Sequence, residues 1–304
     1  MTSCLQAAFH FQPVFYKFVT GFNRTSVTME TTVKPGWSLD KRDPAFIQSQ
    51  MPTWDYLYRY YFRVRSEGWH HIPPGKIMLV GSHNGGLASP DLGMIMYDWF
   101  RRFGTDRPVY GLMHQKIWMV PWLAENAEKM GAIAAHPKVA EAAFKRGAGL
   151  LVFPGGGQDA FRPFHQWNRI NLEGRKGFIR LAIRHGVPIV PFVSAGAHHT
   201  LIVLADLYPA LKELNRMGMR WPFDIDPEVY PLYLGIPWGL AVGPMPNIPL
   251  PAQIFTRICK PIVLCGPEET HLADDRAFVQ HAYEHVLRTM QEELDQLIET
   301  TPYK

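Results

Sequence analysis

Residues 77–91 read IMLVGSHNGGLASPD, and this stretch predicts both the class of fold and the place of a reactive group. The apolar run at 77–80 is short and breaks at Gly81, which predicts a buried β-strand rather than a helix. His83 follows directly, where the chain leaves that strand. In open α/β sheets, ligands bind in the crevice beyond the carboxyl ends of the strands. We therefore expect His83 to lie at a ligand-binding edge of a sheet.

Asp91 stands eight residues after His83 and is followed by LGMIMYDWF, which predicts an early helical residue that folds back toward the histidine. A carboxylate in that place would hold the imidazole in one tautomer. A second interpretation remains open. In it, His83 is a loop residue bonded to a backbone carbonyl, and Asp91 is only a residue favoured in the first turn of a helix.

A second strand ends in the same way, because residues 149–162 read GLLVFPGGGQDAFR. An amphipathic helix is predicted at 174–186 and a further strand at 187–193. Other strands are expected near 108–112 and 130–135, a helix at 137–146, and a long packing helix at the end of the chain. Strands that alternate with helices predict an α/β fold with a mostly parallel central sheet flanked by helices.

The order of these blocks resembles the glycerolipid acyltransferase superfamily. A strand ending in histidine, a Phe-Pro-Gly-Gly loop, an Arg-Lys-Gly-Phe helix and a Val-Pro-Ile-Val-Pro-Phe strand follow one another between residues 60 and 265. The similarity is greatest to the lysophospholipid acyltransferase-like and diacylglycerol acyltransferase type 2-like branches. Two blocks depart from the pattern. The usual spacing of four residues between His and Asp reaches Ala88 here, and Gly155 stands where Phe-Pro-Glu-Gly-Thr-Arg has its glutamate.

The resemblance implies an enzyme that transfers an acyl group from an acyl thioester to the hydroxyl of a lipid acceptor. The donor would be acyl-coenzyme A or acyl carrier protein, as co-substrate, and no cofactor or metal is expected. His83 would act as general base and Asp91 would stabilise the imidazolium. Backbone N–H groups of Gly155, Gly156 and Gly157 would bind the oxyanion, unless these glycines only make a tight turn.

The acceptor is expected to be neutral, such as a diacylglycerol, because glycines replace the usual clamp for a phosphate. Arg162, Lys116 or Arg175 would supply that clamp if the acceptor were a lysophospholipid or a glycerol phosphate. All three could instead be solvated surface charges. An inactive lipid-binding protein remains an alternative, as does a dinucleotide enzyme with a loose Gly-x-Gly-x-x-Ala fingerprint at 155–160.

The composition of the 304-residue chain fits one enlarged α/β domain, expected at 51–304 after an irregular arm or peripheral helix at 1–50. Three dispersed cysteines indicate a reducing compartment. The adjacent histidines at 70–71 and 198–199 lack the separation of zinc ligands. A net charge of +4 is too small to suggest nucleic acid as a partner.

Two segments suggest a membrane surface as a partner, although no stretch reaches the roughly 18 to 20 apolar residues of a spanning helix. Residues 52–65, PTWDYLYRYYFRVR, mix aromatic and basic side chains, and they predict either an interfacial segment or a core helix leading into a strand. Residues 204–255 are apolar and rich in proline, which is expected to exclude regular helix. They predict a lipid-entry lid or a packed loop. We expect a peripheral or monotopic protein on the cytoplasmic side of a membrane.

Overall fold

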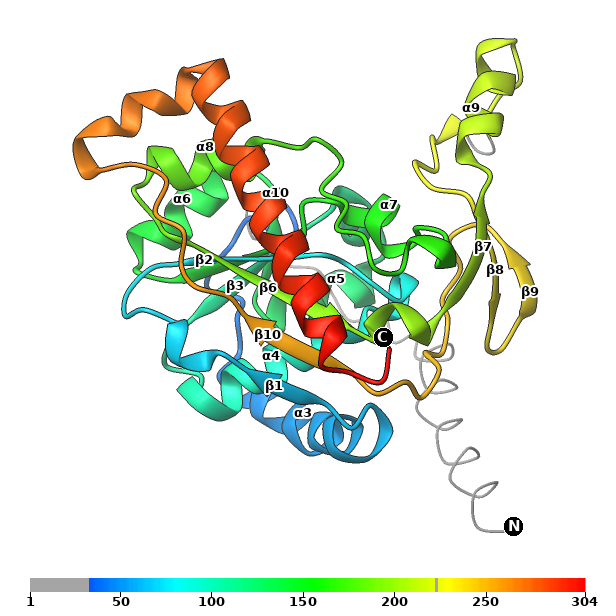
Figure 1. Ribbon diagram of the computed structural model, residues 1–304, viewed down its shortest axis with the longest axis horizontal. Helices are drawn as coiled ribbons and strands as arrows, with labels where there is room; N and C mark the ends of the chain where they lie inside the picture. Colours follow the sequence, from blue (N-terminus) through cyan, green and yellow to red (C-terminus); the bar gives the residue numbers. More distant parts are fainter. Residues whose placement is uncertain (1–32, 222–223, 304) are drawn as a thin grey trace, which may run out of the picture. The chain divides into compact units, whose positions relative to one another are not determined.

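The structure is a computed structural model, and it describes residues 33–221 and 224–303 (Figure 1). In the compact unit Pro35–Lys304, seven strands form a sheet in the order β1-β10-β6-β2-β5-β3-β4. Their bounds are Arg65–Glu67 (β1), Met78–Gly81 (β2), Val109–Met113 (β3), Ala132–Ala134 (β4), Gly149–Val152 (β5), Ile189–Ala195 (β6) and Phe255–Ile258 (β10). The α-helices in this unit are Pro44–Tyr56 (α3), Pro90–Phe103 (α4), Pro121–Lys129 (α5), Pro137–Lys145 (α6), Gly156–Ala160 (α7), Gly177–Arg184 (α8), Tyr208–Arg216 (α9) and Arg276–Glu299 (α10).

The central sheet is mostly parallel, as the alternation of strands and helices predicts. Strands β6, β2, β5, β3 and β4 run in one direction. Strand β10 is antiparallel to β6, and β1 pairs in parallel with β10 at the edge. Helices cover both faces. The α/β fold with a mostly parallel sheet flanked by helices is therefore confirmed.

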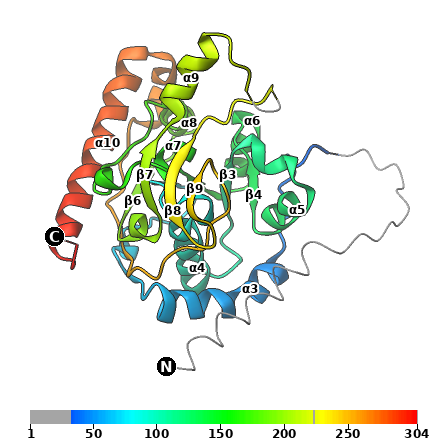
Figure 2. The same ribbon diagram turned by 90° about the vertical axis from the view of Figure 1, so that its right-hand side faces the viewer.

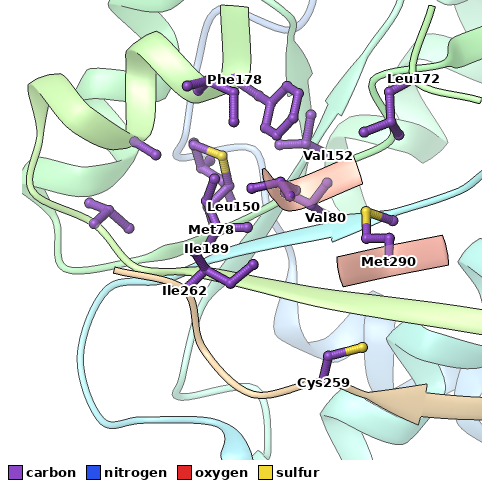
Figure 3. Close-up of a cluster of buried hydrophobic side chains, with 14 of the residues drawn as sticks. Met78, Val80, Leu150, Val152, Leu172, Phe178, Ile189, Cys259, Ile262 and Met290 are labelled. Carbon is purple, nitrogen blue, oxygen red and sulfur yellow. The ribbon is translucent and has the colours of Figure 1, made fainter. Parts of the chain in front are cut away.

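Strand β2 is buried on both faces, which explains why residues 77–80 form a continuous apolar run. Ile77 and Leu79 pack against a cluster that includes residues of α3 and α4. Met78 and Val80 point the other way, into a larger cluster formed with α6, α8 and α10 (Figure 3). A strand enclosed by two helical layers needs apolar side chains at every position, not at alternate ones.

The compact unit begins before residue 51. Asp43 caps α3 by accepting hydrogen bonds from the N–H groups of Ala45 and Phe46, and Ile47 is fully buried. The expected boundary between residues 50 and 51 thus lies within helix α3, and of the arm expected at 1–50 the part at 1–32 lies outside the described residues. Helix α3 continues into a π-helical turn at Leu57–Tyr61 and then β1, the helix-then-strand arrangement considered for 52–65.

The segment 204–255 is more regular than expected. Strands β7 (Ile202–Asp206), β8 (Pro231–Gly235) and β9 (Gly239–Val242) form a separate antiparallel sheet, which faces the viewer in Figure 2. The expectation that prolines exclude helix was wrong for α9. Pro209 lies in its first turn, where the missing N–H breaks no hydrogen bond. Within the described ranges, no helix is long and apolar enough to cross a membrane.

Candidate active site

The site lies where β2 leaves the sheet, between its parallel neighbours β5 and β6. His83 is the second residue after β2, and Phe153 is the first residue after β5. Their rings stack, with centroids 4.4 Å apart and an interplanar angle of 29°. The two strand exits therefore meet at one edge of the sheet, as their sequence pattern predicts.

Asp91 folds back onto His83 despite the longer loop. A single turn of 3-10 helix at Gly86–Ala88 takes up the additional residues, with Gly85 and Gly86 in the left-handed region. Asp91 then falls in the first turn of α4, is 2% exposed, and lies 3.4 Å from His83 Nδ1. Its Oδ2 also accepts a 2.7 Å hydrogen bond from the N–H of Asn84. The carboxylate thus contacts the ring and also fixes the loop.

The opposite nitrogen of the ring faces a hydroxyl that sequence reasoning missed. Ser89 Oγ lies 3.2 Å from His83 Nε2 and 3.0 Å from the carbonyl oxygen of Gly86. Ser89 occupies the N-cap position of α4, yet its φ of 43° is left-handed and its side chain caps no helical N–H. The imidazole of His83 therefore lies between Ser89, at Nε2, and Asp91, at Nδ1. No motif or periodicity marks this relation in the sequence.

A buried ion pair lies behind His83, and its acidic member was also missed. Asp159, fully buried in α7, accepts a 2.9 Å hydrogen bond from the Ser82 hydroxyl and a short one from the backbone N–H of His83. Its Oδ1 lies 2.5 Å from Arg162 Nη1. Burial raises the pKa of Asp159 to about 6, although Arg162 and the N–H of His83 act in the opposite direction. Paired with Arg162, the carboxylate holds the histidine's backbone in place.

Arg162 is 3% exposed and its guanidinium is directed at protein acceptors. Besides Asp159, it donates to Asn84 Oδ1 at 2.7 Å and to the carbonyl oxygen of His83 at 3.1 Å. Asn84 in turn donates to Asp91 through its backbone N–H and, at 3.3 Å, through its side-chain amide. A closed network therefore runs from Arg162 through Asn84 and Asp91 to the imidazole, and back through Asp159.

The other two cations proposed for a phosphate clamp, Arg175 and Lys116, are not part of this hydrogen-bond network. Arg175 lies against the glycine-rich loop and donates to the carbonyl oxygen of Pro154 at 3.0 Å. Lys116 forms a 3.2 Å ion pair with Glu228 and donates to backbone oxygens nearby. The structure thus brings Arg175, but not Lys116, to the loop that follows β5.

The three glycines have different surroundings. A methyl group on Gly155 would lie 2.1 Å from a backbone carbonyl oxygen, and Gly156 has a φ of 57°, so a tight turn accounts for both. The N–H of Gly156 donates to the carbonyl oxygen of Phe153 at 3.1 Å. That hydrogen bond removes Gly156 from the expected oxyanion donors. Gly157 is the second residue of α7, the short helix that carries Asp159.

The charges around the imidazole set its proton affinity. Burial is the strongest single influence and lowers the pKa of His83, but the carboxylates of Asp91 and Asp159 together outweigh it, so the pKa lies above its usual value. His198, in the turn after β6, is buried, and this burial, aided by Arg162, lowers its pKa to about 2. His198 is therefore neutral beside the network. Among the described residues, no three His, Cys, Asp or Glu side chains gather in a group suited to a metal ion.

Comparison with known proteins places this site in a family. The family model described as diacylglycerol acyltransferase matches residues 41–205, more than half of the chain. An uncharacterized protein of Mycobacterium tuberculosis is 26% identical over 283 residues, covering 92% of this chain and 73% of its own. Human 2-acylglycerol O-acyltransferase 3 is 25% identical over 139 residues, or 45% of this chain and 38% of its own.

Among solved structures, the 1-acyl-sn-glycerophosphate acyltransferase of Thermotoga maritima superposes with a TM-score of 0.47 at 17% identity, covering 82% of this chain and 79% of that one. The family match includes both strand exits, the His83 loop and the glycine-rich loop with Asp159 and Arg162. The chain belongs to the diacylglycerol acyltransferase family and is an acyltransferase.

Proposed function

We propose that this protein transfers an acyl group from an acyl thioester to the free hydroxyl of a neutral glycerolipid, such as a diacylglycerol, with His83 as the general base. One observation carries the proposal. A carboxylate lies at one nitrogen of His83 and a hydroxyl at the other, 3.4 Å and 3.2 Å away. In a general base arranged in this way, the carboxylate orients the ring through Nδ1, and Nε2 receives the proton.

In the proposed reaction, the acceptor hydroxyl takes the place that the Ser89 hydroxyl occupies beside Nε2. Its oxygen attacks the thioester carbonyl while its proton passes to Nε2, and Asp91 stabilises the imidazolium. Collapse of the tetrahedral intermediate breaks the C–S bond, and the proton passes from Nε2 to the departing thiolate. The N–H groups of Gly155 and Gly157 would bind the oxyanion. Thioesters of coenzyme A and of acyl carrier protein offer the same electrophile.

The surroundings of Arg162 support a neutral acceptor. A phosphate clamp needs N–H donors that are free to reach the ligand. Arg162 is buried, paired with Asp159 and bonded to Asn84, so contact with a phosphate would break hydrogen bonds that hold His83. Arg175 is the cation that a lysophospholipid or glycerol phosphate would have to use, because it lies at the glycine-rich loop.

A second route is favoured by the placement of Ser89. In this route Ser89 Oγ attacks the thioester, the Oγ–C bond forms as the C–S bond breaks, and the proton passes through His83 Nε2 to the thiolate. The acceptor hydroxyl, or water, then attacks the acyl-serine ester and returns a proton to Ser89 through the same histidine. Serine, histidine and aspartate act in this way wherever their geometry permits, whatever their order in the chain.

One set of assays tests both routes. Purified protein is given labelled acyl-coenzyme A with diacylglycerol, monoacylglycerol or lysophosphatidic acid, and the lipid products are resolved. We expect preference for an uncharged acceptor, and a loss of about 10²-fold to 10⁴-fold in His83→Ala with the fold intact. Activity of His83→Ala within a few-fold of the parent would remove His83 from the mechanism.

Ser89→Ala separates the routes. Direct transfer predicts activity in this variant and no covalent adduct on the parent protein. The acyl-serine route predicts loss of activity, together with a mass increase of one acyl group on the parent when the acceptor is withheld. For the acceptor, a strong preference for lysophosphatidic acid that is lost in Arg175→Gln would contradict the neutral-acceptor proposal.

A further inference from the structure

The second sheet is apolar on both faces. Its inner side chains, Val203, Tyr233 and Ala241, are buried. The outer side of the sheet and the adjoining turns carry exposed apolar side chains, which we call the apolar face. These side chains are Leu204, Leu234, Ile236, Trp238, Leu240, Val242 and Ile248. Leu240 is 64% exposed and Trp238 is 51% exposed. An antiparallel sheet with one free face normally places polar side chains there, so this face indicates a partner.

The apolar face is continuous and carries no charge. Leu234 lies opposite Leu240 in the ladder, and Leu232 lies opposite Val242, so aliphatic side chains form adjoining rows. Ile236 and Ile248 form a bridge that extends the surface beyond β8. The chain contains no Asp, Glu, Lys, Arg or His between Glu228 and Arg257.

The same segment is hydrogen-bonded to the loop that carries His83. Asn247 donates to the carbonyl oxygen of Gly85 at 3.1 Å and accepts from the N–H of Ala88 at 3.3 Å. Between these two residues of the loop, the side chain of Leu87 is 54% exposed. Asn247 directly precedes Ile248, so the apolar face adjoins the loop that carries His83.

We propose that the apolar face, with Leu87, is the surface by which this protein docks on a lipid bilayer, so that the acceptor reaches His83 without passing through water. This inference rests on the proposed function, because it names the phase from which that acceptor comes. The surface adjoins the loop that carries His83, which argues for lipid over a protein partner. Trp238 at the hairpin tip is a residue type enriched at membrane interfaces.

One basic side chain, Arg63, lies at the end of the uncharged segment and suits an anionic headgroup. Arg63 donates to the carbonyl oxygen of Pro251 at 3.3 Å, and Tyr61 donates to that of Pro249 at 2.6 Å. The aromatic and basic residues near position 60 therefore meet the proline-rich segment at its end. A lipid surface that carries phosphatidylglycerol matches both the apolar face and the charge of Arg63.

The test uses the full chain and vesicles of phosphatidylcholine with phosphatidylglycerol, and it measures binding by flotation without any substrate. A hairpin variant, Trp238→Ser with Leu240→Ser, should bind at least about tenfold more weakly, because it removes two exposed apolar side chains that would enter the hydrocarbon boundary. Val263→Ser is the matched control. Val263 is 74% exposed but lies beside the amino-terminal end of β6, so this variant should bind like the parent.

Thermal unfolding of each variant shows whether the fold is kept, and Leu87→Ser provides a second probe that leaves the hairpin unchanged. Vesicle binding by the hairpin variant equal to that of the parent would overturn the proposal. A parent that is dimeric, does not float, and becomes monomeric in the hairpin variant would show that a second copy covers this face. Loss of vesicle binding only when residues 1–32 are removed would assign docking to that segment. If vesicles are bound as expected but no lipid is acylated, docking stands and the proposed function fails.

Discussion

Asp91→Asn tests how the carboxylate behind His83 contributes to the base. The substitution keeps the size of the side chain, and the amide oxygen can still accept from the N–H of Asn84, which holds the loop. The amide nitrogen would then face His83 Nδ1 and donate to it. That contact places the proton on Nε2, where it blocks the nitrogen that must receive the acceptor's proton.

The sign of the pH effect follows from the causes of the His83 pKa. Burial lowers this pKa, and Asp91 together with Asp159 raises it above its usual value, so removing the charge of Asp91 lowers the pKa. The base works only when neutral, so activity rises with pH through the pKa of His83. In the parent protein this rise should lie above the usual value for histidine. In Asp91→Asn it should move to lower pH.

The loss of rate above the pKa follows from the same contact. A hydrogen bond to a charged group contributes about 1.5 to 3 kcal/mol, so its loss from the imidazolium corresponds to roughly 10-fold to 10²-fold in rate. The separation of 3.4 Å is longer than a charge-assisted hydrogen bond of about 2.7–2.9 Å. We therefore expect a loss in the lower half of that range, smaller than in His83→Ala.

The assay is the pH profile of kcat/KM between about pH 5 and 9, read by thiol release and checked by lipid product. Asp98→Asn is the matched control. Asp98 is equally buried on the same helix, but it pairs with Arg101 and accepts from the Tyr58 hydroxyl instead of contacting His83. This control should lose stability and keep its pH profile. An unmoved acid limb in Asp91→Asn, or an equal movement in the control, would refute the reasoning.

Three further results are expected. Gly155→Ala should lose activity and stability, because its methyl group would lie 2.1 Å from a carbonyl oxygen. In Gly157→Ala the methyl group would lie 3.3 Å from a side-chain methyl, so the loss in activity assays and thermal unfolding should be smaller. Arg162→Gln should destabilise by about 3 to 5 kcal/mol in urea unfolding, by leaving a buried carboxylate unpaired, and should slow neutral and phosphorylated acceptors equally. Phe192→Ala should cost about 3 to 5 kcal/mol by the same measurement, since its fully buried ring fills the space above Gly81.

The central sheet and the position of His83 could be predicted because the required signals are local. A short, continuous apolar run that is soon followed by glycine or proline marks a strand enclosed on both faces, as β2 and β5 show. Pro90 at the first helical position marks the start of α4 and brings Asp91 to its first turn. Both features depend on a few neighbouring residues.

The network around His83 could not be predicted, because it is assembled from parts far apart in the chain. Asp159 lies 76 residues from His83 and contacts its backbone, not its side chain, so no residue pattern announces the pair. Ser89 reaches Nε2 only because its backbone is left-handed, a conformation that serine seldom adopts. The strands of the second sheet could not be predicted for a different reason. Both of its faces are apolar, so the alternation that marks a half-exposed strand is missing.

The stacking of His83 on Phe153 gives the site a built-in spectroscopic probe. A proton held over the face of an aromatic ring experiences that ring's diamagnetic current, and the two centroids are only 4.4 Å apart. The carbon-bound protons of the His83 imidazole should therefore resonate upfield of those of histidines elsewhere in the chain, which has 13 in total. Nuclear magnetic resonance could follow the titration of this one ring without any substrate. Displacement of the ring from Phe153 by a bound acyl chain would register as a return toward the ordinary chemical shift.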